Sequence, residues 1–182
     1  MGIPIITTDR LILPPLVAQD AVQIQLIFPQ WDIVRYLTAA VPWPYPGDGA
    51  RQFIEKVALP AMLAGKAWYW TLRQKSSPAQ IIGVINLSDE TDNHRGFWLS
   101  PAFQGRGFMF EACRAVTDFW FNTLQRPVLR VPKASANAAS RRISTKSGMR
   151  LIKTEKKDYV CGTLDSELWE LTREEWNRKY DK

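Results

Sequence analysis

The feature that most constrains the fold is a glycine-containing turn that joins a predicted strand to an amphipathic helix. The strand spans 96–99, the turn contains Gly105 and Gly107, and the helix runs from Gly107 to about Leu124. Apolar residues recur along this helix at the helical period and so form one face, which must pack on a sheet. These residues are Met109, Ala112, Cys113, Val116 and Trp120.

The other segments supply further strands and helices in a mixed order. Alternating or β-rich apolar runs predict strands at 10–13, 68–72, 81–87, 127–131, 149–152 and 168–171. Helical spacing predicts helices at 18–28, 50–64 and 137–147, the first with Val22, Leu26 and Ile27 on its apolar face and the last ended by Gly148. Residues 174–180 form a short tail. This order predicts a mixed α/β (α+β) fold with a split, largely antiparallel sheet.

Composition excludes several classes of protein. The 182 residues, 46% of them hydrophobic, can bury a sizeable core in one domain spanning 1–182. No stretch approaches the roughly 20 apolar residues of a membrane span, and no basic flank precedes an apolar block at the start, so we expect a soluble, cytoplasmic protein. Cys113 and Cys161 lie far apart and His94 is the single histidine, which disfavours a disulfide scaffold and a metal site.

Basic residues are concentrated in one part of the chain. Ten Lys or Arg and one acid, Glu155, lie between Arg126 and Lys157, whereas 158–175 is acidic. This local positive field favours one anionic ligand over a coat of nucleic acid. Nucleic-acid binding is also disfavoured because no aromatic residues alternate with these charges to stack bases.

The turn itself has the residue types of an anion site. Glycines let the backbone approach a ligand, and free amides at a helix start donate to anions such as a pyrophosphate. The run from Gln104 to Met109 lacks the three-glycine Rossmann spacing and the Gly-Lys-Ser/Thr of a P-loop. Taken alone, a two-glycine turn before a helix is most often an ordinary connection.

Two blocks of sequence resemble the GNAT superfamily of N-acetyltransferases. Residues 96–112 are similar to its acetyl-coenzyme A motif, Gln/Arg-x-x-Gly-x-Gly/Ala, and residues 137–149 to its Asn-x-x-Ser…Lys-x-Gly-Phe block. The ends, 8–13 and 168–176, resemble the RimJ/RimL branch of ribosomal-protein alanine and serine acetyltransferases. The likeness covers nearly the whole chain and implies a three-layer fold with a V-shaped central sheet. Three positions depart from the pattern: Met109 for Gly or Ala, Met149 for Phe, and Pro14 for Arg.

The resemblance implies a set of residues that bind acetyl-coenzyme A. Backbone amides of Gln104, Gly105, Arg106, Gly107, Phe108 and Met109 would hold the pyrophosphate, and Asn137 the pantetheine arm. Lys146, Arg141 or Arg142 would reach the phosphates, or would simply be solvated. Phe97, Trp98 and Leu99 would lie beside the thioester, with the Leu99 amide polarising its carbonyl.

Direct attack by an amine on the thioester needs a neutral amine and a proton for the leaving thiolate. The candidate bases are Glu90 and His94, ranked above Glu155, with Asp89 as a further possibility. Ser140 is the candidate proton donor, because Ser144 occupies the position of the Tyr found in many superfamily members. A serine at a helix start can alternatively satisfy backbone groups.

The resemblance implies that the acceptor is a primary amine, either a protein N-terminus or a small molecule, and the sequence does not choose between them. Trp43, Tyr45 and Trp68 are candidates for the acceptor pocket or for packing at its rim. The sequence leaves open a monomer or a homodimer. The alternative function is a non-catalytic acyl-coenzyme A binding module, because the Tyr is missing and the base is undecided.

Overall fold

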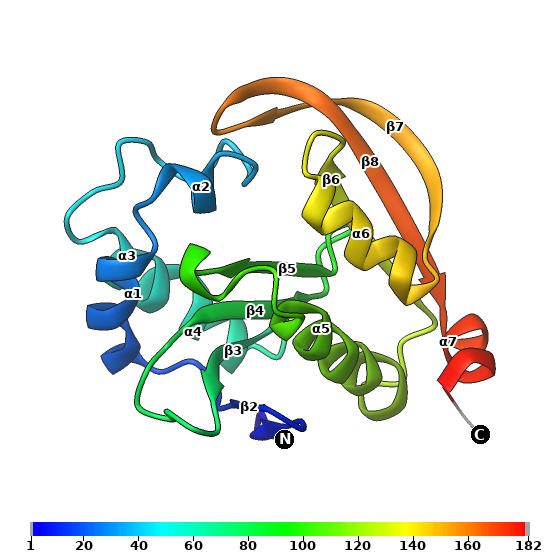
Figure 1. The fold of residues 1–182 in the computed structure, drawn as a ribbon, viewed down its shortest axis with the longest axis horizontal. Helices are drawn as coiled ribbons and strands as arrows, with labels where there is room; N and C mark the ends of the chain where they lie inside the picture. Colours follow the sequence, from blue (N-terminus) through cyan, green and yellow to red (C-terminus); the bar gives the residue numbers. More distant parts are fainter. Residues whose placement is uncertain (1, 181–182) are drawn as a thin grey trace.

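The computed structural model describes residues 2–180, and its strands form two antiparallel sheets (Figure 1). The first sheet has the order β1-β2-β3-β4-β5, with β1 (Ile6–Thr7), β2 (Leu11–Leu13), β3 (Ala67–Gln74), β4 (Gly83–Ser88) and β5 (Arg95–Leu99). The second has the order β6-β8-β7, with β6 (Val128–Ala134), β7 (Arg150–Tyr159) and β8 (Gly162–Thr172). The mixed α/β fold with a split, antiparallel sheet is therefore confirmed.

The two sheets meet where β5 begins. The His94 amide donates to the Arg130 carbonyl at 2.9 Å, and the Arg130 amide donates to His94 Nδ1 at 2.8 Å. Amides along a strand point alternately to its two edges, so the backbone nitrogen of Pro132, two residues after Arg130, also faces β5. Proline has no amide hydrogen to donate. Pro132 thus removes the next possible bond between the sheets, which helps to keep the split open beyond Arg130.

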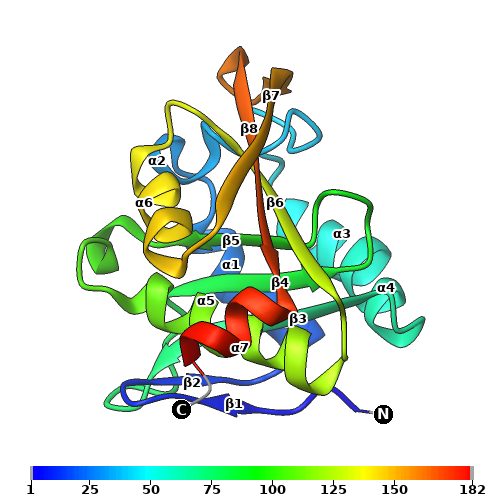
Figure 2. The same cartoon turned by 90° about the vertical axis from the view of Figure 1, so that its right-hand side faces the viewer.

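Helices cover both faces of the first sheet (Figure 2). One side carries α5 (Phe108–Asp118) and its π-helical extension (Phe119–Thr123), against which α7 (Arg173–Tyr180) packs. The other side carries α1 (Ala21–Ile27), α2 (Trp31–Val34), α3 (Gly49–Phe53), a π-helical turn (Ile54–Ala58) and α4 (Leu59–Leu63). Helix α6 (Ala138–Ser147) instead packs on the second sheet. Two hydrophobic cores follow from this arrangement, one on each side. The short 3-10 turns are Ala18–Asp20 and Pro101–Phe103.

Alternation along β3 sends neighbouring aromatic residues to different cores. Trp68 packs against Trp120 of the α5 side, with ring centroids 6.3 Å apart, whereas Tyr69 joins the core on the α1 side together with Tyr45. The expectation that Trp68 lines one pocket with Tyr45 is therefore wrong, because the sheet separates them.

The first predicted helix forms, but its expected apolar face is wrong. Val22 is 71% exposed and Leu26 is 80% exposed, while Ala21, Ile24 and Phe28 are buried. Residues 21, 24 and 28 also follow the helical period, and the position of the sheet selects that stripe instead.

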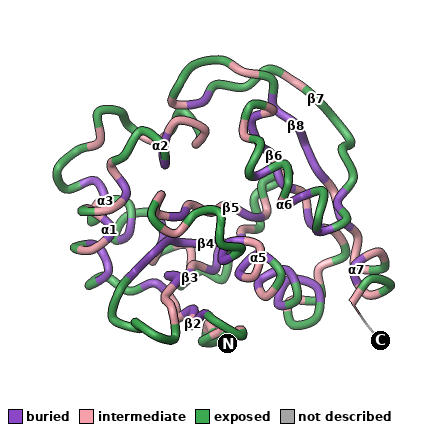
Figure 3. The backbone as a smooth tube through the Cα atoms, in the orientation of Figure 1, coloured by how far each residue is buried: buried purple, intermediate pink, exposed green. Residues whose placement is uncertain are grey.

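The hairpin of β7 and β8 is much longer than the sequence indicates. We expected one strand to start at 149–152 and the last strand to hold 168–171; the first runs on to Tyr159, and the second begins at Gly162. Most of β7 is exposed (Figure 3), so no pattern of burial marks it in the sequence. The hairpin tip reaches the chain after α2, where the amides of Val160 and Cys161 donate to the carbonyls of Leu37 and Arg35.

Residues 2–180 contain neither a membrane-spanning helix nor a cluster of metal-binding side chains. None of the helices there is long and apolar enough to cross a membrane. In the same part of the chain, no three His, Cys, Asp or Glu side chains gather in a way that could hold a metal ion.

Candidate active site

The turn between β5 and α5 presents its backbone amides outward. Gly105 and Gly107 have φ angles of +75° and +81°, a conformation that costs L side chains energy, and a Cβ at Gly105 would meet nothing within 4 Å. Gly107 caps α5, so the first amides of that helix lack acceptors within it. No acceptor from residues 2–180 is recorded for the amides of 105–107 either. The turn therefore has free donors and open space, as an anion requires.

A network from the N-terminal strands fixes this turn. The Glu111 carboxylate accepts from the Thr8 hydroxyl at 2.5 Å and from Arg10 Nε at 2.7 Å. Arg10 also donates to the Arg106 carbonyl at 2.9 Å. Burial raises the pKa of Glu111, but the hydrogen bonds from Thr8 and Arg10 outweigh it and hold the pKa below its usual value. Glu111 thus stays charged while it anchors the turn.

The side chains of Phe108 and Met109 point into the core, so they leave the outer side of the turn free. Both are buried, and the Arg10 guanidinium lies over the Phe108 ring, 4.4 Å from its centroid. Met109, which departs from the family pattern, therefore contributes its backbone amide to the turn and its side chain to packing. Arg106 is exposed.

The outer edge of β5 is directed toward the split between the sheets. The Ser100 amide donates to the Ile82 carbonyl, on the β4 side. Because amides alternate along a strand, those of Leu99 and Phe97 point away from β4. The Leu99 carbonyl accepts from Gln104 Nε2 at 2.9 Å, which ties the turn to the strand end. The β5 edge and the turn thus present an interrupted row of free donors, because the amides of Ser100, Phe103 and Gln104 between them donate to chain carbonyls. The expectation that the Gln104 amide holds the pyrophosphate is therefore wrong, since that amide donates to the Pro101 carbonyl.

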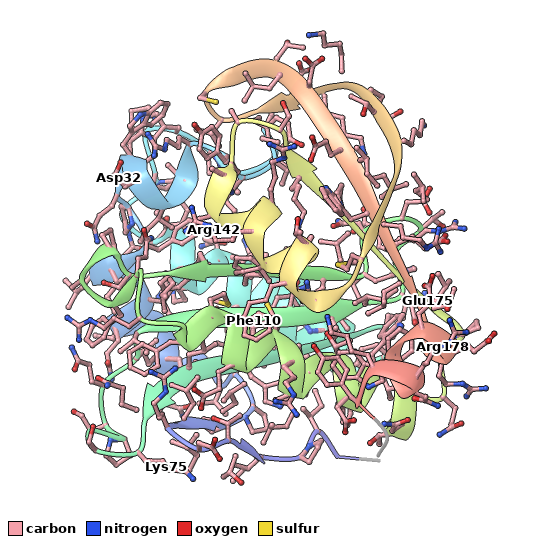
Figure 4. All side chains as sticks on the ribbon, turned by 45° about the vertical axis from the view of Figure 1, so that its right-hand side comes forward. Asp32, Lys75, Phe110, Arg142, Glu175 and Arg178 are labelled. Carbon is pink, nitrogen blue, oxygen red and sulfur yellow. The ribbon has the colours of Figure 1, made fainter. Side chains whose placement is uncertain are left out.

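Helix α6 supplies the basic residues near this row. Asn137 caps the helix by accepting from the Ser140 amide at 3.2 Å. The Lys146 ammonium lies 4.1 Å from the ring centroid of Phe110, in the first turn of α5. Arg142 on α6 is exposed, and Figure 4 shows it above Phe110 in that view. Arg141 instead pairs with Glu167 at 2.9 Å.

Comparison with family models identifies this arrangement. Residues 10–150 match the model described as an acetyltransferase (GNAT) domain. The chain belongs to the GNAT acetyltransferase family. A search of curated protein sequences finds no match to it.

Solved structures share the GNAT fold at low sequence identity. A ribosomal-protein-S5-alanine acetyltransferase from Vibrio fischeri superposes with a TM-score of 0.80 at 17% identity, covering 95% of this chain and 98% of that one. RimJ of Mycobacterium smegmatis, in complex with a coenzyme A disulfide, has a TM-score of 0.78 at 16% identity, covering 91% and 83%. The microcin C7 self-immunity acetyltransferase MccE, with acetyl-coenzyme A and AMP, has a TM-score of 0.75 at 16% identity, covering 91% and 93%.

Three of the four candidate bases in this GNAT domain are held by other groups. His94 accepts the Arg130 amide at Nδ1 and stacks on Trp120, and burial lowers its pKa although Asp92 opposes the shift. Asp89 pairs with Arg126 at 2.7 Å. The loop that carries these residues, and Glu90 with them, precedes β5, whereas the glycine turn follows it (Figure 1).

Glu155 is the third candidate base that is held. It pairs with Lys153 at 2.6 Å and with Lys157 at 3.3 Å, and the Lys153 hydrogen bond, with that from Lys157, lowers its pKa. Glu90 differs, because among residues 2–180 it forms no ion pair and accepts only from the amide side chain of Asn93.

The sequence analysis missed a buried polar cluster behind α6. Lys133 on β6 is 4% exposed and donates to the hydroxyl and carbonyl oxygens of Ser140, each at 3.2 Å, and to the Ser144 hydroxyl. Arg95 on β5 is also buried, where it donates to Thr117. Position 133 continues the inward alternation of Leu129 and Val131, and that spacing was the signal available in the sequence.

An aromatic group lies on the other side of the first sheet. Phe28 contacts Tyr45 and Trp98, with ring centroids 4.9 and 5.4 Å away. Trp43 instead contacts Trp31 of α2, and both are partly exposed. Tyr45 and Trp98 therefore share a face, whereas Trp43 belongs to a separate pair.

Proposed function

We propose that this GNAT domain transfers the acetyl group of acetyl-coenzyme A to a primary amine by direct attack on the thioester. The observation that carries this proposal is the set of free amides at 105–107, in the turn at the start of α5, together with the unpaired edge of β5. A pyrophosphate fits the turn because its amides are free and the dipole of α5 favours negative charge there. Lys146 and Arg142 would add positive charge, and Asn137 would contact the pantetheine arm.

The edge of β5 would hold the reacting end of the cosubstrate. The amide of Leu99, aimed into the split, would donate to the thioester oxygen as negative charge develops on it. Phe97 and Trp98 would line the strand on its two faces, since their side chains lie in different cores. Ser140 would donate a proton to the departing thiolate.

Glu90 is the base that we propose, acting through water on the attacking amine. Its carboxylate is exposed and carries no ion pair to a described residue, unlike those of Asp89 and Glu155. Burial raises the pKa of Tyr69, and the charge of Glu90 raises it further; the Tyr69 side chain packs against the core on the α1 side.

The acceptor that we propose to test first is a peptide N-terminus beginning with Ala or Ser. The support is the shared fold with acetyltransferases named for ribosomal proteins, although MccE, with the same fold, is named for immunity to a microcin. A small-molecule amine is therefore the alternative acceptor.

Thiol release from acetyl-coenzyme A tests this proposal. Peptides with N-terminal Ala or Ser and a panel of small amines should release thiol at a rate that saturates with acceptor. Glu90→Gln should lower kcat at least tenfold and leave the affinity for coenzyme A unchanged, whereas the exposed control Glu55→Gln should match the parent protein. Binding of coenzyme A with no thiol release for any amine would instead indicate a non-catalytic acyl-coenzyme A module.

A further inference from the structure

Lys133 is an ammonium group enclosed by hydroxyl and carbonyl oxygens. Its three recorded hydrogen bonds go to two oxygens of Ser140 and to the Ser144 hydroxyl, and none goes to a carboxylate. A lysine has three protons to donate, so this set accounts for all of them. Burying such a cation without a bound anion is costly, which suggests that the chain retains Lys133 for a reason other than stability.

The titratable groups around Lys133 come from three further elements, and among them the buried Cys113 thiol is neutral because burial raises its pKa. Arg95 on β5 faces it, as do Cys113 on α5 and Glu167 on β8. The carboxylate of Glu167 is already bound by Arg141 and by the indole of Trp169, each at 2.9 Å. Burial, and then the charge of Arg95, lower the pKa of Lys133 to about 7. At neutral pH this lysine can therefore give up a proton, which an exposed lysine cannot do readily.

The two serines differ in where they can pass that proton. Ser144 is 0% exposed, whereas Ser140 is 7% exposed and lies in the first turn of α6, beside the capping residue Asn137. Since Lys133 donates to the Ser140 oxygen, the Ser140 hydroxyl hydrogen is free to point elsewhere. Ser140 thus connects the buried lysine to the start of α6, where the proposed pantetheine site lies.

We propose that Lys133 supplies, through the hydroxyl of Ser140, the proton that the coenzyme A thiolate takes up when it leaves. This inference rests on the proposed acetyl transfer. The amine nitrogen forms a bond to the thioester carbon, and the carbon–sulfur bond breaks with its electron pair on sulfur. Sulfur takes the Ser140 proton, Ser140 takes one from Lys133, and the amine proton leaves to water. Lys133 regains a proton from water through Ser140. It does not itself touch the coenzyme, so it is a positioning residue.

The test compares Lys133→Met with the exposed control Lys75→Met. First, the parent protein must bind coenzyme A and release thiol; if it does neither, the proposed function fails before this inference is reached. Lys133→Met should then lower kcat about 100-fold, in the range of general acid catalysis. Calorimetric affinity for coenzyme A and the KM for acetyl-coenzyme A should stay within about twofold, and Lys75→Met should match the parent protein.

Two readouts separate proton supply from a structural role. The kcat of the parent protein should fall as pH rises through about 7, where Lys133 loses its proton, and Lys133→Met should lack that fall. The second readout is thermal unfolding. Between pH 7 and 10.5, Lys133 is largely deprotonated in the folded protein but protonated in the unfolded chain. The free-energy cost of burying its charge is therefore fully present below pH 7 and is lost progressively as the pH rises to 10.5. Lys133→Met should therefore gain most in unfolding temperature near pH 6, while it loses activity.

Serine variants complete the design. Ser140→Ala should lose as much kcat as Lys133→Met, and the double variant should lose no more than either, because both act in one path. Ser144→Ala should cost less than tenfold. Retention of kcat in Lys133→Met, or a matching loss of coenzyme A affinity, would overturn the inference. If Lys133→Met does not fold, the pH profile of the parent protein decides the matter: a kcat that stays constant from pH 6 to pH 9 would overturn the inference.

Discussion

At the scale of single residues, Met109 and Lys133 show how the environment changes what a residue type means. Met109 departs from the family pattern inside the motif, yet its side chain lies in the core and leaves the turn unobstructed. Lys133 belongs to a basic stretch that suggested solvated charge or phosphate contacts, yet it is buried and bound to serines. The sequence names the residue at each position, but whether that residue is buried or exposed decides what its side chain can bind or donate.

Gly107 allows a direct test of the turn. Gly107→Ala places a Cβ at φ +81°, which should cost about 1 kcal/mol of stability. It should also weaken coenzyme A binding, because relief of this strain would turn the amides of the turn. Gly65→Ala is the matched control, since Gly65 has φ +66° with nothing within 4 Å and lies after α4. Thermal unfolding should show similar losses of stability for both variants. Calorimetry should show a loss of affinity for coenzyme A for Gly107→Ala alone. Equal affinities for the two variants would contradict the role of this turn in binding coenzyme A.

At the scale of elements, each end of the chain is tied to the structure by a carboxylate. Glu111 binds the chain before β2 to the start of α5. At the other end, Thr172 and Glu175 form a capping box for α7: the Glu175 amide donates to the Thr172 hydroxyl and the Thr172 amide to the Glu175 carboxylate. The box brings Trp176 into the core, where it is buried.

Because of Glu175, the stability of the folded protein should change with pH in the acidic range. The hydrogen bond from Arg150, together with those from Thr172, lowers its pKa to about 2 although burial opposes them. A depressed carboxyl pKa contributes stability above the usual value near 4.5, and that contribution is lost as pH falls toward 2. Glu175→Gln should lower the unfolding temperature by roughly 2–4 °C at pH 7, about 1 kcal/mol because the pair is partly exposed, and the difference should shrink below pH 4.5.

Glu174→Gln is the control for that experiment. Glu174 lies in the same turn, where its carboxylate pairs with Arg178 at 2.7 Å, and both side chains are exposed. Glu174→Gln should lower the unfolding temperature less than Glu175→Gln does, and its effect should not shrink between pH 4.5 and pH 2 in the same way. A difference for Glu175→Gln that stayed constant from pH 7 to pH 2 would refute the role of its charge.

At the scale of the whole molecule, the split between the sheets is the property on which function depends. His94 and Arg130 join the sheets at one end, and Pro132 prevents the next bond on that edge. The amides of Phe97 and Leu99 therefore remain available to a ligand. If the sheets were paired along their full length, these donors would be used by β6.

Hydrogen exchange can map this row of donors. Adding coenzyme A should slow exchange in peptides that cover 97–99 and 105–110, because bound oxygens would then accept from these amides. Peptides from 150–158 in β7 should not change. Protection confined to β7, with none in the glycine turn, would rule out the proposed binding mode.

The strand, turn and helix of the motif were predictable because each has a strong local signal. The glycine spacing and the apolar face of α5 follow from backbone sterics and helical period, and both lie as expected. The β7–β8 hairpin could not be placed in full, because its exposed Lys and Glu residues show no alternation of burial. The face of α1 was mispredicted because two stripes fit one period and contact with the sheet selects one of them.

What the sequence determined by itself is the set of local structures: where helices begin, where glycine permits a left-handed turn, and which family the motif resembles. These depend on residues close together in the chain. Tertiary structure alone decided that Lys133 contacts Ser140, that His94 bridges two sheets, and that β5 keeps a free edge. Such contacts join segments far apart in the chain, and their chemistry depends on burial, which a single sequence does not specify.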